Sequence, residues 1–282
     1  MSRNPITIKD IRSAKETGRK LVMLTAYDYH TAQIGDAAEL DMLLVGDSLG
    51  MVVYGLESTV GVTMDDMIRH TQAVRRGCKT AHVVADMPFL TYNTSIREAI
   101  YNAGLLLKAG GDSVKLEGGV DFAPTIEAIV KAGIPVVGHI GLTPQTISAL
   151  GGFKAQGRDE ASARAILADA LAVEQAGAYS VVLEAVPSEL GQLISRRLTI
   201  PVIGIGAGPH TDGQVLVYHD LIGLYDRFVP KFVKQFAQLR PQILQAMQDY
   251  RDAVRQSSFP APEHCFRLNE TVKAALADLF EQ

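Results

Sequence analysis

Five successive apolar runs of this sequence each end in, or carry, an ionisable side chain. These side chains are Asp47, Asp86, Lys115 with Glu117, His139 and Glu184, and Ser48 directly follows Asp47. If the runs are parallel β-strands, their carboxyl ends meet at one mouth, which is where such folds carry out chemistry. Any one of these residues could equally cap a helix or carry a solvated loop charge. Their recurrence on five runs favours a shared site.

Asp47 and Asp86 are candidate ligands of a divalent cation. Carboxylates without a nearby cysteine or HxxxH motif suit a hard ion, and Mg²⁺ accepts one or two protein carboxylates together with waters and substrate oxygens. A 2-oxo acid could complete such a shell through its carboxylate and ketone oxygens. The alternative for Asp47 is the N-cap of the helix-like segment that follows it.

Lys115 and Glu117 lie two residues apart on one run, so their side chains point to the same face of a strand. Lys115 would supply a point charge for the substrate carboxylate. Alternatively, it caps a barrel carbonyl or pairs with Glu117. Glu117 would bind the metal directly or through a water molecule.

Glu184 is the best candidate for a general base. Its neighbours in VVLEAVP (181–187) are apolar, which should make the ionised form costly and raise its pKa. The alternative is a buried glutamate paired with an arginine. His139, in VVGHIGLTPQ (136–145), is a candidate proton relay or oxyanion stabiliser, or else a hydrogen-bonded core residue.

The elements that must position these residues are eight short apolar runs separated by amphipathic stretches. The runs span 21–26, 41–47, 81–88, 112–118, 134–141, 179–186, 200–208 and 214–220, with helices expected at 64–77, 95–109, 123–132 and 160–176. Runs rich in Val, Ile and Leu without polar alternation are typical of parallel strands covered on both faces. The sequence therefore predicts an α/β fold, a (β/α)8 TIM barrel.

No Pro/Ser-rich linker divides the chain, so one barrel domain is expected over 1–282, with an N-terminal segment 1–19 and a C-terminal helical tail 227–282. In the tail, helical periodicity covers 231–256, a break follows at 257–262, and 270–280 could form a last helix. Because the barrel is complete before them, these helices are expected to pack on the barrel or on a neighbouring subunit. A homo-oligomer is predicted.

Composition and charge argue against several classes of protein. The 282 residues include 27 Lys and Arg against 31 Asp and Glu, a net charge of −4 that lacks the basic footprint of a nucleic-acid binder. No run approaches 18 apolar residues, so no membrane association is expected. Cys78 and Cys265 form no CxxC pair, and the polar start lacks an apolar signal segment. A cytoplasmic protein is expected.

The motifs around these residues resemble the ketopantoate hydroxymethyltransferase family over nearly the whole chain. They are LTAYDYHTA (24–32), LLVGDSLGMVVYG (43–55), VTMDDMIRHTQAVRRG (62–77), VVADMPF (83–89), VKLEGG (114–119), GHIGLTPQ (138–145), GGFKAQGR (151–158), VLEAVP (182–187) and IGIGAGPHTDGQVLV (203–217). Two residues depart from the family pattern: Glu39 stands where a glycine is expected, and Ser148 where an asparagine is expected.

The resemblance implies a transferase of pantothenate biosynthesis, with Mg²⁺ on Asp47 and Asp86 and with Glu117 as a further ligand or behind the ligands. The substrate contacts that it implies are Asp47, Ser48, Asp86 and Lys115. Glu184 would remove the C3 proton of 3-methyl-2-oxobutanoate. The enolate would attack the one-carbon unit of the cosubstrate 5,10-methylenetetrahydrofolate and give 2-dehydropantoate. Because members of this family assemble as decamers, a homodecamer is expected.

Two alternatives remain open. The first is a 2-oxo acid lyase of the phosphoenolpyruvate mutase and isocitrate lyase type; such lyases usually carry a catalytic cysteine in a mobile loop. Cys78 at a predicted helix end and Cys265 in the tail do not suit that role. The second is a non-catalytic barrel that binds a 2-oxo acid. The absence of Glu184 or of a metal-binding carboxylate would have indicated such a protein, but Asp47, Asp86 and Glu184 are all present.

Overall fold

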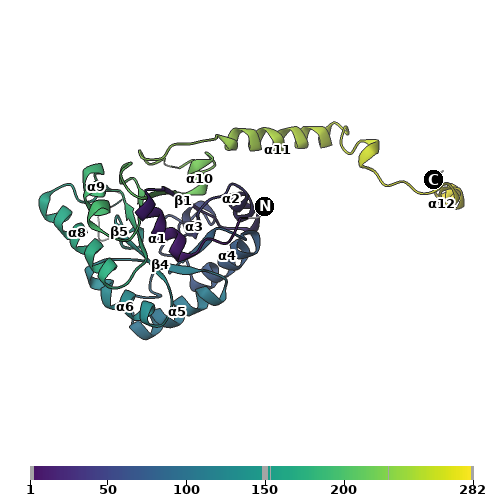
Figure 1. Cartoon of the computed structure of the whole chain (residues 1–282). Helices are drawn as coiled ribbons and strands as arrows, with labels where there is room; N and C mark the ends of the chain where they lie inside the picture. The colour runs from purple at the N-terminus through teal and green to yellow at the C-terminus, as the bar shows by residue number, and fades with distance from the viewer. Residues whose placement is uncertain (1–2, 148–151, 153, 228, 281–282) are drawn as a thin grey trace. The chain divides into compact units, whose positions relative to one another are not determined.

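Eight parallel strands form a closed barrel in chain order in this computed structural model, which describes all residues except 1–2, 148–151, 153, 228 and 281–282. The strands are β1 (Leu21–Thr25), β2 (Met42–Val45), β3 (His82–Asp86), β4 (Ser113–Glu117), β5 (Val136–Gly141), β6 (Ser180–Glu184), β7 (Val202–Ile205) and β8 (Gly213–Leu216). Figure 1 shows helices surrounding the strands. The prediction of a (β/α)8 barrel is confirmed.

The helices that follow the strands are α2 (Tyr29–Ala37), α3 (Leu49–Val52), α4 (Met64–Gly77), α5 (Ile96–Lys108), α6 (Ala123–Lys131), α8 (Glu160–Gln175), α9 (Ser188–Arg197) and α10 (Tyr218–Leu221). The four that the sequence predicts at 64–77, 95–109, 123–132 and 160–176 are confirmed to within one residue as α4, α5, α6 and α8. At the start of α4, Thr63 accepts a hydrogen bond from the Asp66 N–H while the Asp66 carboxylate accepts one from the Thr63 N–H. This reciprocal capping satisfies two free donors at the helix start.

The buried apolar side chains form two layers, one between strands and helices and one inside the barrel. Helix α1 (Ile8–Thr17) contributes Ile11 and Ala14 to the inner layer, and Ile6 packs against it. Ile6 also donates its N–H to the carbonyl of Thr80, just before β3. The N-terminal segment therefore closes the amino end of the barrel.

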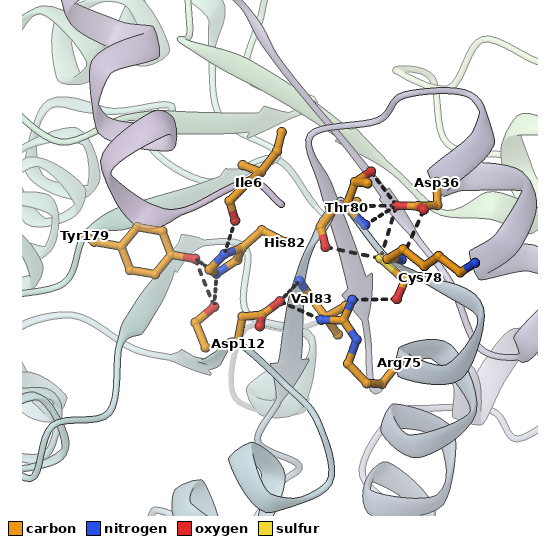
Figure 2. Close-up of polar contacts among 12 residues, drawn as sticks. Ile6, Asp36, Arg75, Cys78, Thr80, His82, Val83, Asp112 and Tyr179 are labelled. Carbon is orange, nitrogen blue, oxygen red and sulfur yellow. Dashed lines mark hydrogen bonds and ion pairs between the residues drawn. The ribbon is translucent and has the colours of Figure 1, made fainter. Parts of the chain in front are cut away.

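A buried polar triangle lies inside this closed end (Figure 2). Nε2 of His82 lies 3.0 Å from Ser113 Oγ and 3.1 Å from the Tyr179 hydroxyl, and these two hydroxyls are 2.9 Å apart. Burial lowers the pKa of His82, which favours the neutral imidazole. Because its members bond one another, this group satisfies its buried polar atoms without a net charge.

The loop that leads into β3 is held by the carboxylate of Asp36 (Figure 2). That carboxylate accepts hydrogen bonds from the N–H groups of Thr80 and Ala81, each at 2.8 Å. Although burial opposes them, these bonds lower the pKa of Asp36 to about 2. Nearby, Arg75 forms an ion pair with Asp112 at 3.0 Å.

The chain divides into two compact units, Met1–Gln235 and Phe236–Gln282. The second contains α11 (Leu239–Arg255), α12 (Glu270–Ala275) and α13 (Ala277–Phe280). Helix α11 therefore begins eight residues later than the periodicity predicts, and the last predicted helix is interrupted at Leu276. That the tail shares a domain with the barrel, or packs on it or on a neighbouring subunit, stays a prediction. Across the described residues, no helix has the length and apolar character needed to cross a membrane.

The backbone conformation at Glu39 explains why the family pattern has a glycine at this position. Glu39 lies in the turn after α2 with φ 58°, in the left-handed region that glycine enters at no steric cost. A glutamate there carries a strain of about 1 kcal/mol. The other departure, Ser148, lies outside the described residues.

Candidate active site

A cavity of about 950 Å³ opens at the carboxyl ends of the strands. Its walls include all seven side chains that the sequence singled out: Asp47, Ser48, Asp86, Lys115, Glu117, His139 and Glu184. They converge because the barrel is closed and each lies in the middle or carboxyl-terminal part of a strand or just beyond its end. The structure thus brings the predicted site together, while the role of each residue stays a prediction.

Strand register places the charged residues beside one another. Asp86 on β3 is opposite Lys115 on β4, and Glu117 is opposite His139 on β5. Lys115 Nζ lies 2.8 Å from Asp86 Oδ1, so its ion pair joins it to Asp86 rather than to Glu117. Burial lowers the pKa of Lys115, but the surrounding carboxylates outweigh it, so the net direction is upward and the ammonium stays charged.

Asp47 is buried beside other carboxylates. Its N–H donates to Asp86 Oδ2 at 3.3 Å. Burial first, and then the charges of Asp86 and Glu117, raise the pKa of Asp47 well above its usual value. The helix-cap alternative is not observed, because Ser48 occupies the N-cap of α3 and no side chain caps that helix. Acidic side chains are therefore crowded together in the buried part of the cavity.

This donor set fits a hard divalent cation. Four carboxyl groups, those of Asp47, Asp86, Glu117 and Glu184, line the cavity with only two basic side chains, Lys115 and His139, and burial raises the pKa of both aspartates, so a bound cation would favour their ionised forms. Within the described part of the chain, no three His, Cys, Asp or Glu side chains could enclose a metal by themselves. Mg²⁺ does not require three, because it keeps waters and substrate oxygens in its shell.

His139 bridges two carboxylates. Its Nδ1 lies 3.3 Å from Glu117 Oε1 and its Nε2 lies 3.1 Å from Glu184 Oε2. Burial and the charge of Lys115 lower the pKa of His139, but the bonds to Glu117 and Glu184 outweigh them and raise it to about 9. With both ring nitrogens protonated, Lys115 Nζ at 3.2 Å from Nδ1 is a close neighbour rather than a hydrogen-bond donor.

Glu184 ends β6 with its side chain 16% exposed, so solvent and substrate can reach the carboxylate. The apolar residues that flank Glu184 in the sequence did not predict that its carboxylate contacts His139. The paired-arginine alternative is not observed among the ion pairs of the described residues. On the neighbouring strand, Gly141 has φ +91°, and a Cβ there would lie 2.4 Å from the Glu184 carbonyl oxygen. A glycine is therefore needed for β5 to end against Glu184.

Sequence reasoning missed Gln145 and its partner Tyr92. Gln145 Nε2 donates to Asp47 Oδ2 at 2.8 Å, its backbone N–H donates to Glu117 Oε2 at 3.0 Å, and its Oε1 accepts from the Tyr92 hydroxyl at 2.6 Å. It lies in the single turn Pro144–Thr146 that follows β5. The only sequence signal was the motif GHIGLTPQ, which ends on this residue.

Ser48 faces the same cavity from the end of β2. Its hydroxyl lies 2.9 Å from that of Tyr27. Cys78 is not among the residues that line the cavity, because its thiol is buried beside the Ala81 carbonyl, and Cys265 belongs to the second unit. The cysteine expected of the lyase alternative is therefore not among the residues that the structure places around this site.

The family model and the curated relatives that match this chain belong to the same family. The family model described as ketopantoate hydroxymethyltransferase matches residues 5–262. A 3-methyl-2-oxobutanoate hydroxymethyltransferase of Moorella thermoacetica is 57% identical over 266 residues, covering 94% of this chain and 99% of that protein. One of the same name from Enterococcus faecalis is 52% identical, covering 96% and 98%.

Solved structures share the fold at low sequence identity. A phosphonopyruvate hydrolase in complex with oxalate and Mg²⁺ superposes with a TM-score of 0.63 at 12% identity, covering 98% of this chain and 96% of that one. A 2,3-dimethylmalate lyase of the PEP mutase/isocitrate lyase superfamily gives 0.58 at 16% identity, covering 98% and 99%. At such identity the likeness shows a common barrel architecture only.

Proposed function

Because this chain belongs to the ketopantoate hydroxymethyltransferase family, we propose that it transfers a hydroxymethyl group from 5,10-methylenetetrahydrofolate to 3-methyl-2-oxobutanoate. The products are 2-dehydropantoate and tetrahydrofolate, with a water molecule supplying the hydroxyl. The observation that carries the proposal is the convergence of two buried aspartates, a lysine and a partly exposed glutamate in one cavity.

Asp47 and Asp86 would hold Mg²⁺, and Glu117 stands behind them. Both oxygens of Glu117 are already engaged, one by the N–H of Gln145 and the other by His139, which suits a residue that orients the site through its neighbours. When bound, the ion supplies positive charge that polarises the ketone of the 2-oxo acid.

Lys115 would bind the carboxylate of the substrate. Its ammonium has three donors, of which the ion pair with Asp86 uses one. Ser48, whose hydroxyl is held by Tyr27, would donate a further hydrogen bond. These contacts would orient the substrate with its C3 atom toward Glu184.

Glu184 would take the C3 proton. The C–H bond breaks, its electron pair forms the C2–C3 double bond of the enolate, and the proton passes to the carboxylate of Glu184. His139 holds that carboxylate at 3.1 Å and so fixes its orientation. C3 of the enolate then bonds to the methylene carbon, whose two C–N bonds to the folate break and whose hydroxyl oxygen comes from water. The two protons of water and the C3 proton end on the new hydroxyl and on the two folate nitrogens, and tetrahydrofolate leaves.

The direct test is formation of 2-dehydropantoate from 3-methyl-2-oxobutanoate and 5,10-methylenetetrahydrofolate, followed with Mg²⁺, after chelation with EDTA, and after Mg²⁺ is restored. Activity should vanish on chelation and return with the ion. Cleavage of 2,3-dimethylmalate in the absence of hydroxymethyl transfer would favour a lyase instead. A cytoplasmic homodecamer, the state expected from the family resemblance, is part of the same proposal.

A further inference from the structure

Asp220 is a buried carboxylate in the active-site cavity for which the reaction above has no use. It lies in α10, just after β8, with 8% of its surface exposed. Among the described residues, its Oδ1 has no hydrogen-bond partner. Burial, with no compensating cation, raises its pKa to about 6. Keeping such a group costs stability, which is typical of a group that serves a ligand.

Apolar and aromatic side chains also line this cavity. They include Leu216 and Val217, which precede α10, Tyr225, whose N–H donates to the carbonyl of His219, and Phe232 and Ile205. A 2-oxo acid held at Asp47 and Lys115 is small and fills only a fraction of about 950 Å³. The remaining space is bounded by aromatic rings and one unpaired carboxylate, which suits a flat ring that carries hydrogen-bond donors on one edge.

Tyr27 connects this wall to the predicted metal site. Its hydroxyl lies 2.9 Å from Ser48 Oγ, and its ring lies 5.5 Å from that of His219, the neighbour of Asp220. Burial chiefly, and then the charges of Asp220 and Asp47, raise the pKa of Tyr27. Because Tyr27 contacts both the residue after Asp47 and the residue before Asp220, and both aspartates line one cavity, a ligand on Asp220 would share that cavity with a substrate on Asp47.

Two lysines line the same cavity at its exposed rim. Lys154 and Lys231 are both exposed, whereas Asp220 is buried. The cavity is thus lined by buried acidic side chains and by two exposed basic ones. A bound molecule that matches this polarity has donors at its inner end and an anionic tail at its outer end.

We propose that Asp220 binds the pterin edge of the folate cosubstrate, accepting hydrogen bonds from its 2-amino group and its N3–H, with the ring against Tyr225 and Phe232 and the glutamate tail toward Lys154 and Lys231. The inference rests on the proposed function, since it assumes that a folate is the one-carbon donor. Paired donors on one edge of a ring match the two oxygens of a carboxylate, and such charge-assisted pairs are both strong and selective.

The test compares the binding of two ligands to one variant. Dissociation constants are measured by calorimetry for tetrahydrofolate and for its 2-desamino-2-methyl analogue, which lacks the amino donor. The proteins are wild type, Asp220→Asn and the control Asp65→Asn, an exposed aspartate in the first turn of α4. Wild type and control should prefer tetrahydrofolate by about 10- to 100-fold, the worth of a hydrogen bond to a charged group. Asp220→Asn should discriminate less than about threefold.

Because the readout is a ratio within each protein, partial loss of folded material in Asp220→Asn cancels. Wild-type discrimination in Asp220→Asn, or no discrimination in wild type, would overturn the inference. So would a second Mg²⁺ equivalent that disappears in Asp220→Asn, since Asp220 would then be a cation site.

A separate measurement on wild type keeps the two proposals apart. With Mg²⁺ and no folate, the C3 proton of 3-methyl-2-oxobutanoate should exchange with D₂O. Absence of exchange contradicts the proposed function. Normal exchange together with unaltered folate discrimination in Asp220→Asn contradicts only the role of Asp220.

Discussion

Replacing Gln145 by leucine removes a side chain that bonds Asp47, a predicted metal ligand. The same side chain bonds Tyr92, whose hydroxyl accepts a hydrogen bond from the N–H of Glu117. Leucine fills much of the same space but cannot form the three hydrogen bonds of the glutamine side chain. Nε2 donates to Asp47 Oδ2 at 2.8 Å and to the Met87 carbonyl at 2.9 Å, and Oε1 accepts from the Tyr92 hydroxyl at 2.6 Å. All these partners lie in the buried interior.

The size of the effect follows from what is left behind. The bond to the charged Asp47 is worth about 1.5–3 kcal/mol, and the stranded Tyr92 hydroxyl adds to the cost, so the free energy of unfolding should fall by about 2–4 kcal/mol. Because Asp47 then loses its orientation, Mg²⁺ affinity should fall about 10- to 100-fold, the usual effect of removing a group that orients a metal ligand.

Calorimetric titration of Mg²⁺ into Gln145→Leu measures this loss, with chemical denaturation to confirm that the variant is folded. The matched control is Gln175→Leu, an exposed glutamine at the end of α8. Tyr92→Phe should have a smaller effect, since it leaves the bond from Gln145 to Asp47 in place. A folded Gln145→Leu that binds Mg²⁺ as tightly as wild type would refute the reasoning.

Three further predictions address the ligands, the cavity wall and the assembly. Asp47→Ala and Asp86→Ala should each weaken Mg²⁺ and 2-oxo acid binding together in calorimetry, because substrate completes the metal shell; unchanged metal affinity in both would remove them from that shell. The folded-state pKa of Asp220, about 6 against 3.8 ordinarily, means that its contribution to stability is full below pH 3.8 and lost as the pH rises through 6. As the pH rises from about 4 to 7, the free energy of unfolding of Asp220→Asn should therefore increase by about 1–2 kcal/mol relative to that of wild type, as measured by denaturation. A difference between the two proteins that does not change with pH would contradict this. Light scattering should give a mass well above 30.4 kDa at micromolar concentration, and a monomeric mass would exclude the oligomer.

The barrel was predictable because its signals are local. Apolar runs of a few residues, each followed by an amphipathic stretch, predict strand and helix in turn, and the Thr63–Asp66 cap marks the start of α4. The seven site residues were found by the same logic, because strand ends in a barrel point to one mouth. The tail was harder to predict, since the periodicity over 231–256 does not show that the helix begins only at Leu239.

The partners of the site residues were not predictable, because they come from distant parts of the chain. Gln145 bonds Asp47 across 98 residues and Tyr92 across 53, and one sequence carries no signal for such pairs. Alternation placed Lys115 and Glu117 on one face, but only the register of β3 against β4 shows that Lys115 pairs with Asp86. Asp220 is the last residue of the predicted run 214–220 but was not among the predicted site residues; β8 itself ends at Leu216.

Loss of the C3 proton signal of 3-methyl-2-oxobutanoate in D₂O, followed by NMR with Mg²⁺ and without folate, tests the central claim most directly. Wild type should exchange this proton, because enolisation precedes one-carbon transfer. Glu184→Gln keeps the size of the side chain but has no basic oxygen, so it should still bind Mg²⁺ and substrate while exchange falls about 10²- to 10⁴-fold. Exchange at the wild-type rate in Glu184→Gln, together with its loss in His139→Asn, would contradict the account and make His139 the base.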